Sequence, residues 1–316
     1  MLPARTFGPV PSRRFGQSLG LNTIPPKTCT YSCVYCQLGH TNRLTLRREG
    51  FCPPGELVAD VRRVLTILKE RGERVDYLTF VPDGEPTLDA WLGDQIRLLK
   101  PLGQRIAVIT NASLLSQEEV RHALAFADRV SVKVDAVRHQ TWQRIDRPHG
   151  DLRLEAVLDG VLQFSEGFGG ELDTETMLLD GLNDDDDNLR PLATFLQHLK
   201  PRCSYLAIPT RPPAVAEIRP AREEAIVRAH DTLSAALSRV ELLTGFEGTD
   251  FANTGDARAD LLAITAVHPM RSDQVELLLQ RCSASWEVVE WLVRQQLLRE
   301  VSHGGHLFYI RRLDNT

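Results

Sequence analysis

The stretch KTCTYSCVYCQLGH, residues 27–40, places three of the six cysteines of the chain within eight residues. Cys29, Cys33 and Cys36 follow the spacing C-x3-C-x2-C, and the other three cysteines are scattered along the chain. A secreted disulfide framework would be denser and would not accompany a long α/β pattern. The three close cysteines therefore indicate a functional site.

Thiolate chemistry leaves two kinds of site open for this loop. Three soft sulfur ligands on one tight loop can hold three irons of a cubane [4Fe–4S] cluster and leave the fourth iron free for another ligand. The same cysteines together with His40 could form a closed tetrahedral zinc site. The loop by itself favours the iron–sulfur cluster, and zinc is the alternative.

Beyond the loop, helix and strand patterns alternate. A helix is expected at 56–71, where apolar residues recur at helical spacing, and a strand at 75–81. The pattern then predicts strands at 105–110, 129–134, 174–179 and 204–208, and helices at 90–100, 117–126, 138–145, 152–164, 188–199 and 222–238. Ser116 is the expected N-cap of the helix 117–126. Alternating strands and helices predict an α/β fold with a parallel sheet or barrel.

Polar residues follow the expected strands. They are Asp83-Gly84-Glu85-Pro86-Thr87, Asn111-Ala112-Ser113, Asp135 and Asp180-Gly181-Leu182-Asn183. Turns use these residue types for their backbone preferences, so each group alone is explained by turn chemistry. In parallel α/β folds, however, ligands bind at the carboxyl ends of the strands. Taken with the cysteine loop, the joint pattern favours a site at this end.

At this point the chain resembles the radical SAM superfamily. The resemblance is carried by CTYSCVYC, by DGEPT and TNAS after two of the strands, and by VKVDA. The segments FGPVPSRRFGQSLGLN, IDRPHG and ETMLLDGLND are similar to one subgroup, which is related to the tRNA wyosine-base (4-demethylwyosine) synthases and is often described as an iron–sulfur oxidoreductase. The similarity extends over about residues 7–244.

The resemblance implies a partial (β/α)6 barrel with the cluster at its open end. It also implies two cofactors, a [4Fe–4S] cluster and S-adenosylmethionine, which would bind the open iron through its methionine amino and carboxylate groups. An electron from a donor of the flavodoxin or ferredoxin type would cleave the sulfonium bond. The resulting 5′-deoxyadenosyl radical would abstract hydrogen from a substrate.

The family motifs also transfer to individual residues. Cys29, Cys33 and Cys36 would be the cluster ligands, and Tyr35 occupies the aromatic position of the motif. The cofactor-binding residues implied by the resemblance are Asp83, Gly84, Glu85, Asn111, Ser113 and Asp135. In the family, the Gly84-Glu85 pair contacts the methionine amino group, and Asp83 stands where the usual motif has a glycine. Asn111, Ser113 and Asp135 fall where the carboxylate or the ribose is contacted. Lys133 either reaches the site or points outward from its strand.

The remaining cysteines separate this chain from the wyosine synthases. Those enzymes hold a second cluster on additional N-terminal cysteines, and this chain has no cysteine before Cys29. That difference argues against the same reaction. We expect Cys203 and Cys282 to be buried and inert. Cys52, close behind the cluster loop, is the best candidate of the three for a redox or substrate role.

The C-terminal part has a pattern of its own. A barrel domain at 1–245 and a linker at 246–256 are expected to precede a small domain at 257–316. Helices at 257–267, 272–280 and 285–296, then two strands around Gly304-Gly305, resemble a winged helix-turn-helix. Residues 250–316 carry seven Arg and Lys against nine Asp and Glu. This balance favours protein interaction or substrate presentation over nucleic-acid binding, which stays open.

Composition bounds the partners and the location. The net charge of −5 gives no global attraction to nucleic acid. No apolar run reaches the ~20 residues that span a bilayer, and the N-terminus lacks the apolar core of a signal peptide, so we expect a cytoplasmic protein without membrane contact. The substrate is unknown, with RNA or a protein side chain bound through the C-terminal domain as candidates.

Three functional hypotheses follow. The first is a radical SAM enzyme. The second is a winged-helix regulator whose cysteine loop senses metal or redox state, which would not need the DGEPT and TNAS segments. The third is a degenerate radical SAM fold that serves only as a scaffold, suggested by Asp83 in place of the motif glycine.

Overall fold

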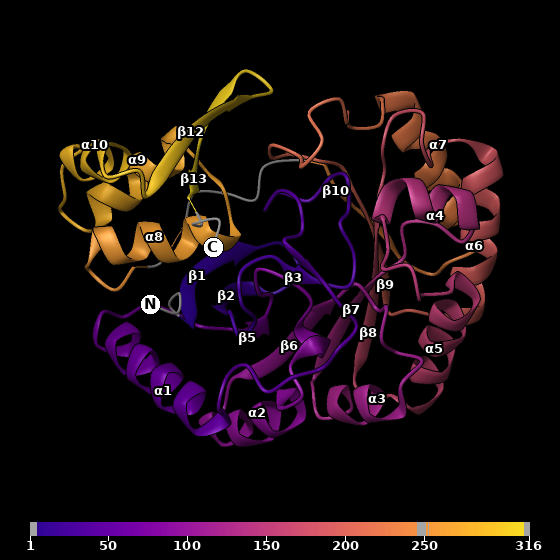
Figure 1. The fold of residues 1–316 in the computed structure, drawn as a ribbon, viewed down its shortest axis with the longest axis horizontal. Helices are drawn as coiled ribbons and strands as arrows, with labels where there is room; N and C mark the ends of the chain where they lie inside the picture. Colours follow the sequence, from indigo (N-terminus) through magenta and orange to yellow (C-terminus); the bar gives the residue numbers. More distant parts are fainter. Residues whose placement is uncertain (1–4, 245–250, 252, 313–316) are drawn as a thin grey trace.

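The computed structural model describes residues 5–244, 251 and 253–312. Its main body is an eight-stranded sheet in the order β1-β2-β5-β6-β7-β8-β9-β10, parallel from β2 onward, with β1 antiparallel to β2. The strands are β1 (Thr6–Ser12), β2 (Gly16–Leu21), β5 (Tyr77–Phe80), β6 (Arg105–Thr110), β7 (Arg129–Lys133), β8 (Glu171–Met177), β9 (Cys203–Ala207) and β10 (Val240–Leu243). The sheet curls into a half-barrel with helices around its outer face (Figure 1). The expected α/β fold with a curled parallel sheet is confirmed.

The described main body has seven helices: six lie around the outside of the sheet, and α4 (His139–Asp146) packs against the cysteine loop. They are α1 (Pro54–Glu70), α2 (Leu92–Leu99), α3 (Glu118–Leu124), α4 (His139–Asp146), α5 (Leu154–Gly167), α6 (Asp186–Leu199) and α7 (Glu223–Ser234). Single turns of 3-10 helix lie at η1 (Pro86–Leu88) and η2 (Lys100–Leu102). In α1 the apolar positions Leu57, Val61, Val64 and Leu68 are all buried, which is the helical spacing seen in the sequence. None of the described helices combines the length and the apolar character that crossing a bilayer requires.

Several details of the main body differ from the sequence expectations. The strands β1, β2 and β10 were not expected, because β1 contains Pro9 and Pro11 and β10 is only four residues long. Proline is compatible with β1 because the strand lies at the sheet edge, where a missing donor is tolerated. Ser116 is not the N-cap of α3: Gln117 precedes the helix, and its side chain makes no capping bond. The Asp185 side chain does cap α6, by accepting a hydrogen bond from Asn188 N at 2.9 Å.

The C-terminal unit has its own apolar core. It consists of α8 (Ala257–Val267), β11 (Met270–Arg271), α9 (Ser272–Arg281), α10 (Glu287–Arg294), β12 (Leu298–His303) and β13 (His306–Arg311). The three strands pair in the order β11-β13-β12. The expected three helices and hairpin are therefore present, and β11 is an addition. Whether this arrangement is a winged helix stays a prediction, as do the domain boundaries at 245 and 257.

The C-terminal unit packs against the first strands of the main body. Phe7 of β1 forms a small apolar cluster with Ala266 and Val267 at the end of α8, and the two units lie side by side in Figure 1. Residues 246–250 and 252 of the expected linker lie outside the described residues. Of the described linker residues, Phe251 and Asn253 are buried, and Asn253 Oδ1 accepts a hydrogen bond from Arg71 Nη2 at 2.7 Å.

Candidate functional site

The cysteine loop runs between the two-residue strands β3 (Thr28–Cys29) and β4 (Arg43–Leu44). Its turns are closed by the hydrogen bonds Cys36 N to Cys33 O and Gly39 N to Cys36 O, both 3.1 Å. Val34 N donates to Ile145 O at 2.9 Å, which fastens the loop to the end of α4. The three thiols are free and partly buried. The loop is thus a compact, anchored turn that presents three thiols.

The protein surrounds these thiols with polar groups from the segments after β5 and β6 and from the end of α4. Asn111 Nδ2 lies 3.5 Å from Cys29 Sγ, and the Cys33 thiol donates to Asp146 Oδ1 at 3.4 Å. Burial, and then the Glu85 carboxylate, raise the pKa of Cys29 to about 12. Burial and Asp146 raise the pKa of Cys33 well above its ordinary value. Thiolates here need positive charge to be stable, which bound iron ions would supply.

The segment that follows β5 packs tightly against the cysteine loop. A Cβ atom on Gly84 would lie 1.8 Å from the carbonyl oxygen of Thr28, so only glycine allows this approach. Glu85 N donates to Thr28 O at 3.2 Å, and Lys27 N donates to Asp83 O at 2.7 Å. Gly84 therefore allows the backbone after β5 to lie in direct contact with the backbone of the cysteine loop.

The Glu85 carboxylate is buried and fully occupied by its own chain. Its Oε1 accepts from Thr87 N at 3.0 Å, Thr87 Oγ1 at 2.7 Å and Thr110 Oγ1 at 2.6 Å. Its Oε2 accepts from Asn111 N at 2.8 Å. Burial raises the pKa of Glu85 and these hydrogen bonds lower it. This carboxylate joins the ends of β5 and β6.

Asp83 is the opposite case. Its side chain is 1% exposed, and neither carboxylate oxygen has a hydrogen-bond partner among the described residues. Burial raises its pKa to about 7, although the nearby Asn22 side chain, Arg311 and Lys27 all lower it. A buried polar group without a partner is costly, so each such group calls for an explanation. Two free acceptors at this position suit a ligand with an ammonium group.

The end of β6 is tied to the same loop. Asn111 Nδ2 donates to Thr30 Oγ1 at 2.7 Å, and Thr30 Oγ1 lies 2.7 Å from Ser113 Oγ. Asn111 Oδ1 in turn accepts from Ser113 N at 3.0 Å. Thr30 was not among the residues singled out from the sequence, although it lies inside the cysteine motif.

The end of β7 completes the site from the other side. Tyr35 donates its hydroxyl hydrogen to Asp135, whose Oδ1 also accepts from Met177 N at 2.7 Å. Burial and Asp135 raise the pKa of Asp146 well above the ordinary value of an aspartate. Asp146 lies in the IDRPHG segment, but the sequence alone did not mark it as a site residue. Asn183, at the end of β8, donates to Asp135 O at 2.9 Å.

A cavity of about 270 Å³ opens beside these residues inside the half-barrel. We call it the chamber. It is lined by Tyr35 and Cys36 from the loop, by Lys133 and Glu175 from the sheet, and by Arg211 from the segment after β9. Lys133 Nζ lies 2.8 Å from Glu175 Oε1 and 4.7 Å from the centre of the Tyr35 ring. Lys133 therefore points inward and reaches the site.

The other three cysteines lie elsewhere. None of them lines the chamber. Cys52 and Cys203 are buried, and Cys282 is only partly buried. Burial raises the pKa of Cys52 to about 11, which disfavours a reactive thiolate. His40, the fourth ligand of the zinc alternative, is exposed.

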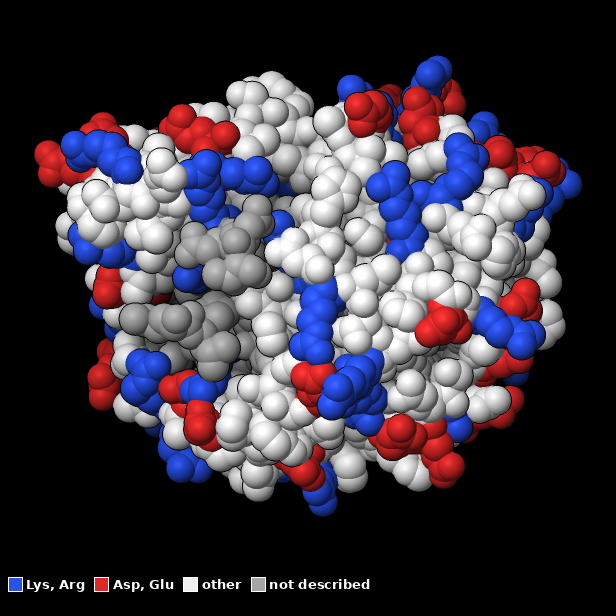
Figure 2. Space-filling model, in the orientation of Figure 1, with Lys and Arg blue, Asp and Glu red and all other residues white. Residues whose placement is uncertain are grey.

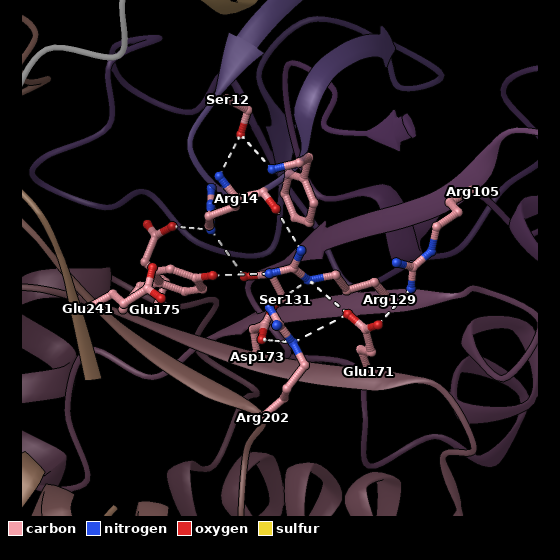
Figure 3. A network of polar contacts seen from close by, with 12 residues as sticks. Ser12, Arg14, Arg105, Arg129, Ser131, Glu171, Asp173, Glu175, Arg202 and Glu241 are labelled. Carbon is pink, nitrogen blue, oxygen red and sulfur yellow. Dashed lines mark hydrogen bonds and ion pairs between the residues drawn. The ribbon is translucent and has the colours of Figure 1, made fainter. Parts of the chain in front are cut away.

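A second polar cluster lies inside the half-barrel and extends from the start of β7 and β8 to Arg14 and Glu175, which line the chamber (Figure 3). Arg129 pairs with Asp173, and it also donates to Tyr205 Oη at 3.0 Å and to Arg14 O at 2.6 Å. Arg14, from the β1–β2 turn, pairs with Glu175 and bonds Ser131 Oγ at 3.1 Å. Burial raises the pKa of Glu175, but Lys133 and Arg14 outweigh it and hold the pKa at about 2. Sequence reasoning missed this cluster. The alternating charged residues of β7 and β8 were its signal, because a strand turns every second side chain to the same face.

Comparisons with known proteins agree with the fold and the motif. A family model described as the Radical SAM superfamily matches residues 23–190, just over half of the chain. A UPF0026 protein of Methanocaldococcus jannaschii is 40% identical over 97% of this chain and 96% of its own length. A UPF0026 protein of Synechocystis is 37% identical over 65% of this chain and 76% of its own.

A solved structure, TYW1 with a lysine-pyruvate adduct bound, is similar with a TM-score of 0.54. The similarity covers 70% of this chain and 74% of that one at 14% identity, so it shows a shared fold. Radical SAM proteins use a [4Fe–4S] cluster and S-adenosylmethionine. The family model and the extent of the sequence identity lead to one assignment: this chain belongs to the radical SAM superfamily.

Proposed function

We propose that this protein is an enzyme that holds a [4Fe–4S] cluster on Cys29, Cys33 and Cys36 and binds S-adenosylmethionine beside it. When bound, the two cofactors would supply reductive cleavage of the sulfonium bond and a 5′-deoxyadenosyl radical that acts on a substrate in the chamber. The proposal includes the relation to the wyosine-base synthases and the winged-helix nature of the C-terminal unit. An electron donor of the flavodoxin or ferredoxin type is its required partner.

One observation carries the proposal. Three free thiols and the polar ends of β5, β6 and β7 meet at one end of the half-barrel, next to the chamber. Ligands of parallel α/β folds bind at this end. Among the described residues, no three His, Cys, Asp or Glu side chains converge on one metal-ion position. In a cubane cluster each thiolate binds its own iron, so this spread suits a cluster better than a single zinc ion.

The residues beside the thiols fit the second cofactor. The two unpartnered oxygens of Asp83 would accept hydrogen bonds from the amino group of the methionine part. The close approach at Gly84 would bring the backbone of residues 83–85 next to the cluster loop. Asn111 and Ser113 would orient the carboxylate, and Asp135, held by Tyr35, would face the ribose. Glu85 would act as a positioning residue, because its oxygens are already satisfied.

The proposal is tested by anaerobic reconstitution of the full chain with iron and sulfide. Dithionite and S-adenosylmethionine are then added, and 5′-deoxyadenosine is quantified by mass spectrometry. We expect slow formation by the wild type and at least a ~100-fold loss in Cys33→Ala, because one cluster ligand is removed. Cys282→Ala is the matched control, since its thiol lies in the C-terminal unit.

The same preparation distinguishes the regulatory alternative. Its metal content is measured before turnover. Bound zinc without iron, together with no 5′-deoxyadenosine, would contradict the enzyme and favour a metal-sensing regulator. A full cluster with no cleavage of S-adenosylmethionine, with and without the RNA used below, would instead favour the scaffold reading.

A further inference from the structure

The hairpin of the C-terminal unit faces the main body across two cavities that we together call the seam. One cavity of about 660 Å³ lies at the tip of the hairpin, and another of about 280 Å³ lies at its base. No Asp or Glu lines either cavity among the described residues. On the face shown in Figure 2, several Lys and Arg side chains lie near the middle of the molecule, with Asp or Glu beside some of them, and charges of both signs lie toward its edges.

The pairing of the hairpin determines which side chains face the seam. Opposite residues of an antiparallel pair share a face, and the register joins Arg299 to Ile310 and His303 to His306. The other face carries Tyr309, which packs against Trp286 and whose hydroxyl group donates a hydrogen bond to Glu300 Oε1 at 3.0 Å. The only carboxylate of the hairpin between 298 and 311 is thus on the far side. Arg299, His303 and His306 form the hairpin wall of the seam.

The main body supplies a second basic wall. Lys27 precedes the cysteine loop and lines the cavity at the base, whereas Arg211 and Arg219 line the cavity at the tip. Lys27, Arg219 and Arg299 make no ion pair with any residue in the described part of the chain. Like charges that face each other repel. Burial and the nearby Arg219 lower the pKa of His303, as expected for a crowded basic environment.

The chamber lies between the two cavities of the seam. It shares Pro209, Thr210 and Arg211 with the cavity at the tip, and Leu38 with the cavity at the base. Arg211 Nη1 donates to Gln37 Oε1 at 2.9 Å, and Gln37 Nε2 donates to Val267 O at 2.8 Å. These bonds join the barrel, the cysteine loop and the C-terminal unit at the point where the seam meets the chamber.

We propose that the seam binds a single-stranded RNA whose phosphates lie between the two basic walls and one of whose nucleotides enters the chamber. This inference rests on the proposed function and extends it, because the RNA would be the substrate of the enzyme. The phosphates of an RNA carry negative charge at regular intervals, which complements the basic residues that line both cavities. Its bases are flat rings that stack on histidine and arginine side chains, and the walls provide both. An acidic protein segment offers the charge without the rings.

The test is fluorescence anisotropy of a fluorescein-labelled 12-nucleotide RNA with the reconstituted full chain. No S-adenosylmethionine or reductant is present, so binding is measured independently of radical chemistry. A failure to bind RNA can therefore be distinguished from a failure to form 5′-deoxyadenosine. We expect binding that weakens with salt, with a slope of about −0.7 per phosphate contact in a plot of log K against log salt.

The decisive variant removes one unpaired charge from each wall, Arg219→Gln with Arg299→Gln. We expect at least ~10-fold weaker binding at low salt and a salt slope smaller by about 1.4, because two phosphate contacts are lost. The matched control is Arg63→Gln with Arg190→Gln, two exposed arginines on α1 and α6, which should bind like the wild type. Arg219→Lys with Arg299→Lys keeps the charges and should retain most of the slope.

Two results would overturn the proposal. One is equal RNA affinity of the seam variant and the control variant. The other is displacement of the RNA by polyglutamate at the same concentration of charge that unlabelled RNA requires, since this would show a surface for any polyanion. Comparison with the lysine pair separates loss of charge from loss of folding.

Discussion

The half-barrel buries charged side chains among its strands and also beyond their carboxyl ends. The charges among the strands are paired, whereas Asp83, beyond the end of β5, is not paired with any described residue. Where β7 and β8 begin, Arg129 pairs with Asp173. Further along β8, Glu175 pairs with Arg14 and Lys133, and these three residues also line the chamber. Where the strands of the sheet end, Asp83 has no hydrogen-bond partner for its carboxylate oxygens within the described residues. The pKa values follow the pairing: Lys133 and Arg14 hold that of Glu175 at about 2, whereas burial raises that of Asp83 to about 7.

This contrast separates a structural end from a functional one. Buried charges that satisfy each other add little net stability, but they are costly to break. Buried polar groups without a hydrogen-bond partner cost free energy, and a bound ligand can supply the missing partner. The end with the cysteine loop is therefore the end where a ligand would bind, and the Arg129–Asp173 pair at the start of the strands supports the half-barrel. Four substitutions test this distinction.

Breaking the paired end should have the largest effect on stability. Arg129→Met removes the partner of Asp173 together with the bonds to Tyr205 and to the Arg14 carbonyl. We expect a loss of about 3–5 kcal/mol in the free energy of unfolding, because a buried carboxylate loses its closest cation. Urea denaturation followed by circular dichroism measures it.

The control for this substitution is Arg105→Met, whose ion pair with Glu171 is half exposed. It should cost less than about 1 kcal/mol, as exposed pairs do. Equal losses in the two variants would show that the inner cluster has no special structural role.

Asp83→Asn should change how stability depends on pH. The carboxyl pKa of about 7 in the folded state exceeds the value of about 3.9 in the unfolded chain, so the folded wild type binds the proton more tightly. Its contribution to stability is complete below pH 4 and is lost as the pH rises to 7. The variant lacks this loss and should be about 2–4 kcal/mol more stable than wild type at pH 8.

Thermal unfolding between pH 4 and pH 9 measures this difference. The gap between variant and wild type should grow between pH 4 and pH 7 and then stay constant. A gap that is the same at every pH would mean that Asp83 is ionised in the fold without penalty.

Gly84→Ala should disturb the contact between the β5 turn and the cysteine loop. Its new methyl group would lie 1.8 Å from Thr28 O, so one of the two backbones must move. We expect a cost of about 1–3 kcal/mol in unfolding free energy, together with a lower iron content after reconstitution. The control is Gly150→Ala, in which no atom lies within 4 Å of the new methyl group. It should keep the wild-type unfolding free energy and iron content. Normal iron content in Gly84→Ala would show that the close approach does not position the thiols.

Tyr35→Phe should have the smallest effect. It removes the hydroxyl bond to Asp135, but Met177 N still donates to the same carboxylate. We expect a loss of about 1 kcal/mol in unfolding free energy. Urea denaturation measures this loss. A loss above ~3 kcal/mol would mean that Tyr35 is as important for stability as Arg129.

Local patterns predicted the regular parts of the fold well. The strand 105–110 and the helix 257–267 have the expected bounds, because each is a continuous run with one periodicity. The edge strands β1 and β10 escaped prediction, since prolines and short length hide them. Spacing predicted that the three thiols share a loop. The ties from Thr30 to Asn111 and from Cys33 to Asp146 join residues 81 and 113 positions apart, which no local pattern reveals.

The chain by its sequence alone determined the cysteine loop, the alternation of strands and helices, and the polar residues after each strand, because these depend on neighbouring residues. The tertiary structure decided which charges are paired. Residues 250–316 carry more acidic than basic side chains, yet Arg299 shares a cavity with Lys27, and no Asp or Glu of the described residues lines that cavity. A sum over residues cannot show this, because pairing depends on strand register and on contacts between distant segments.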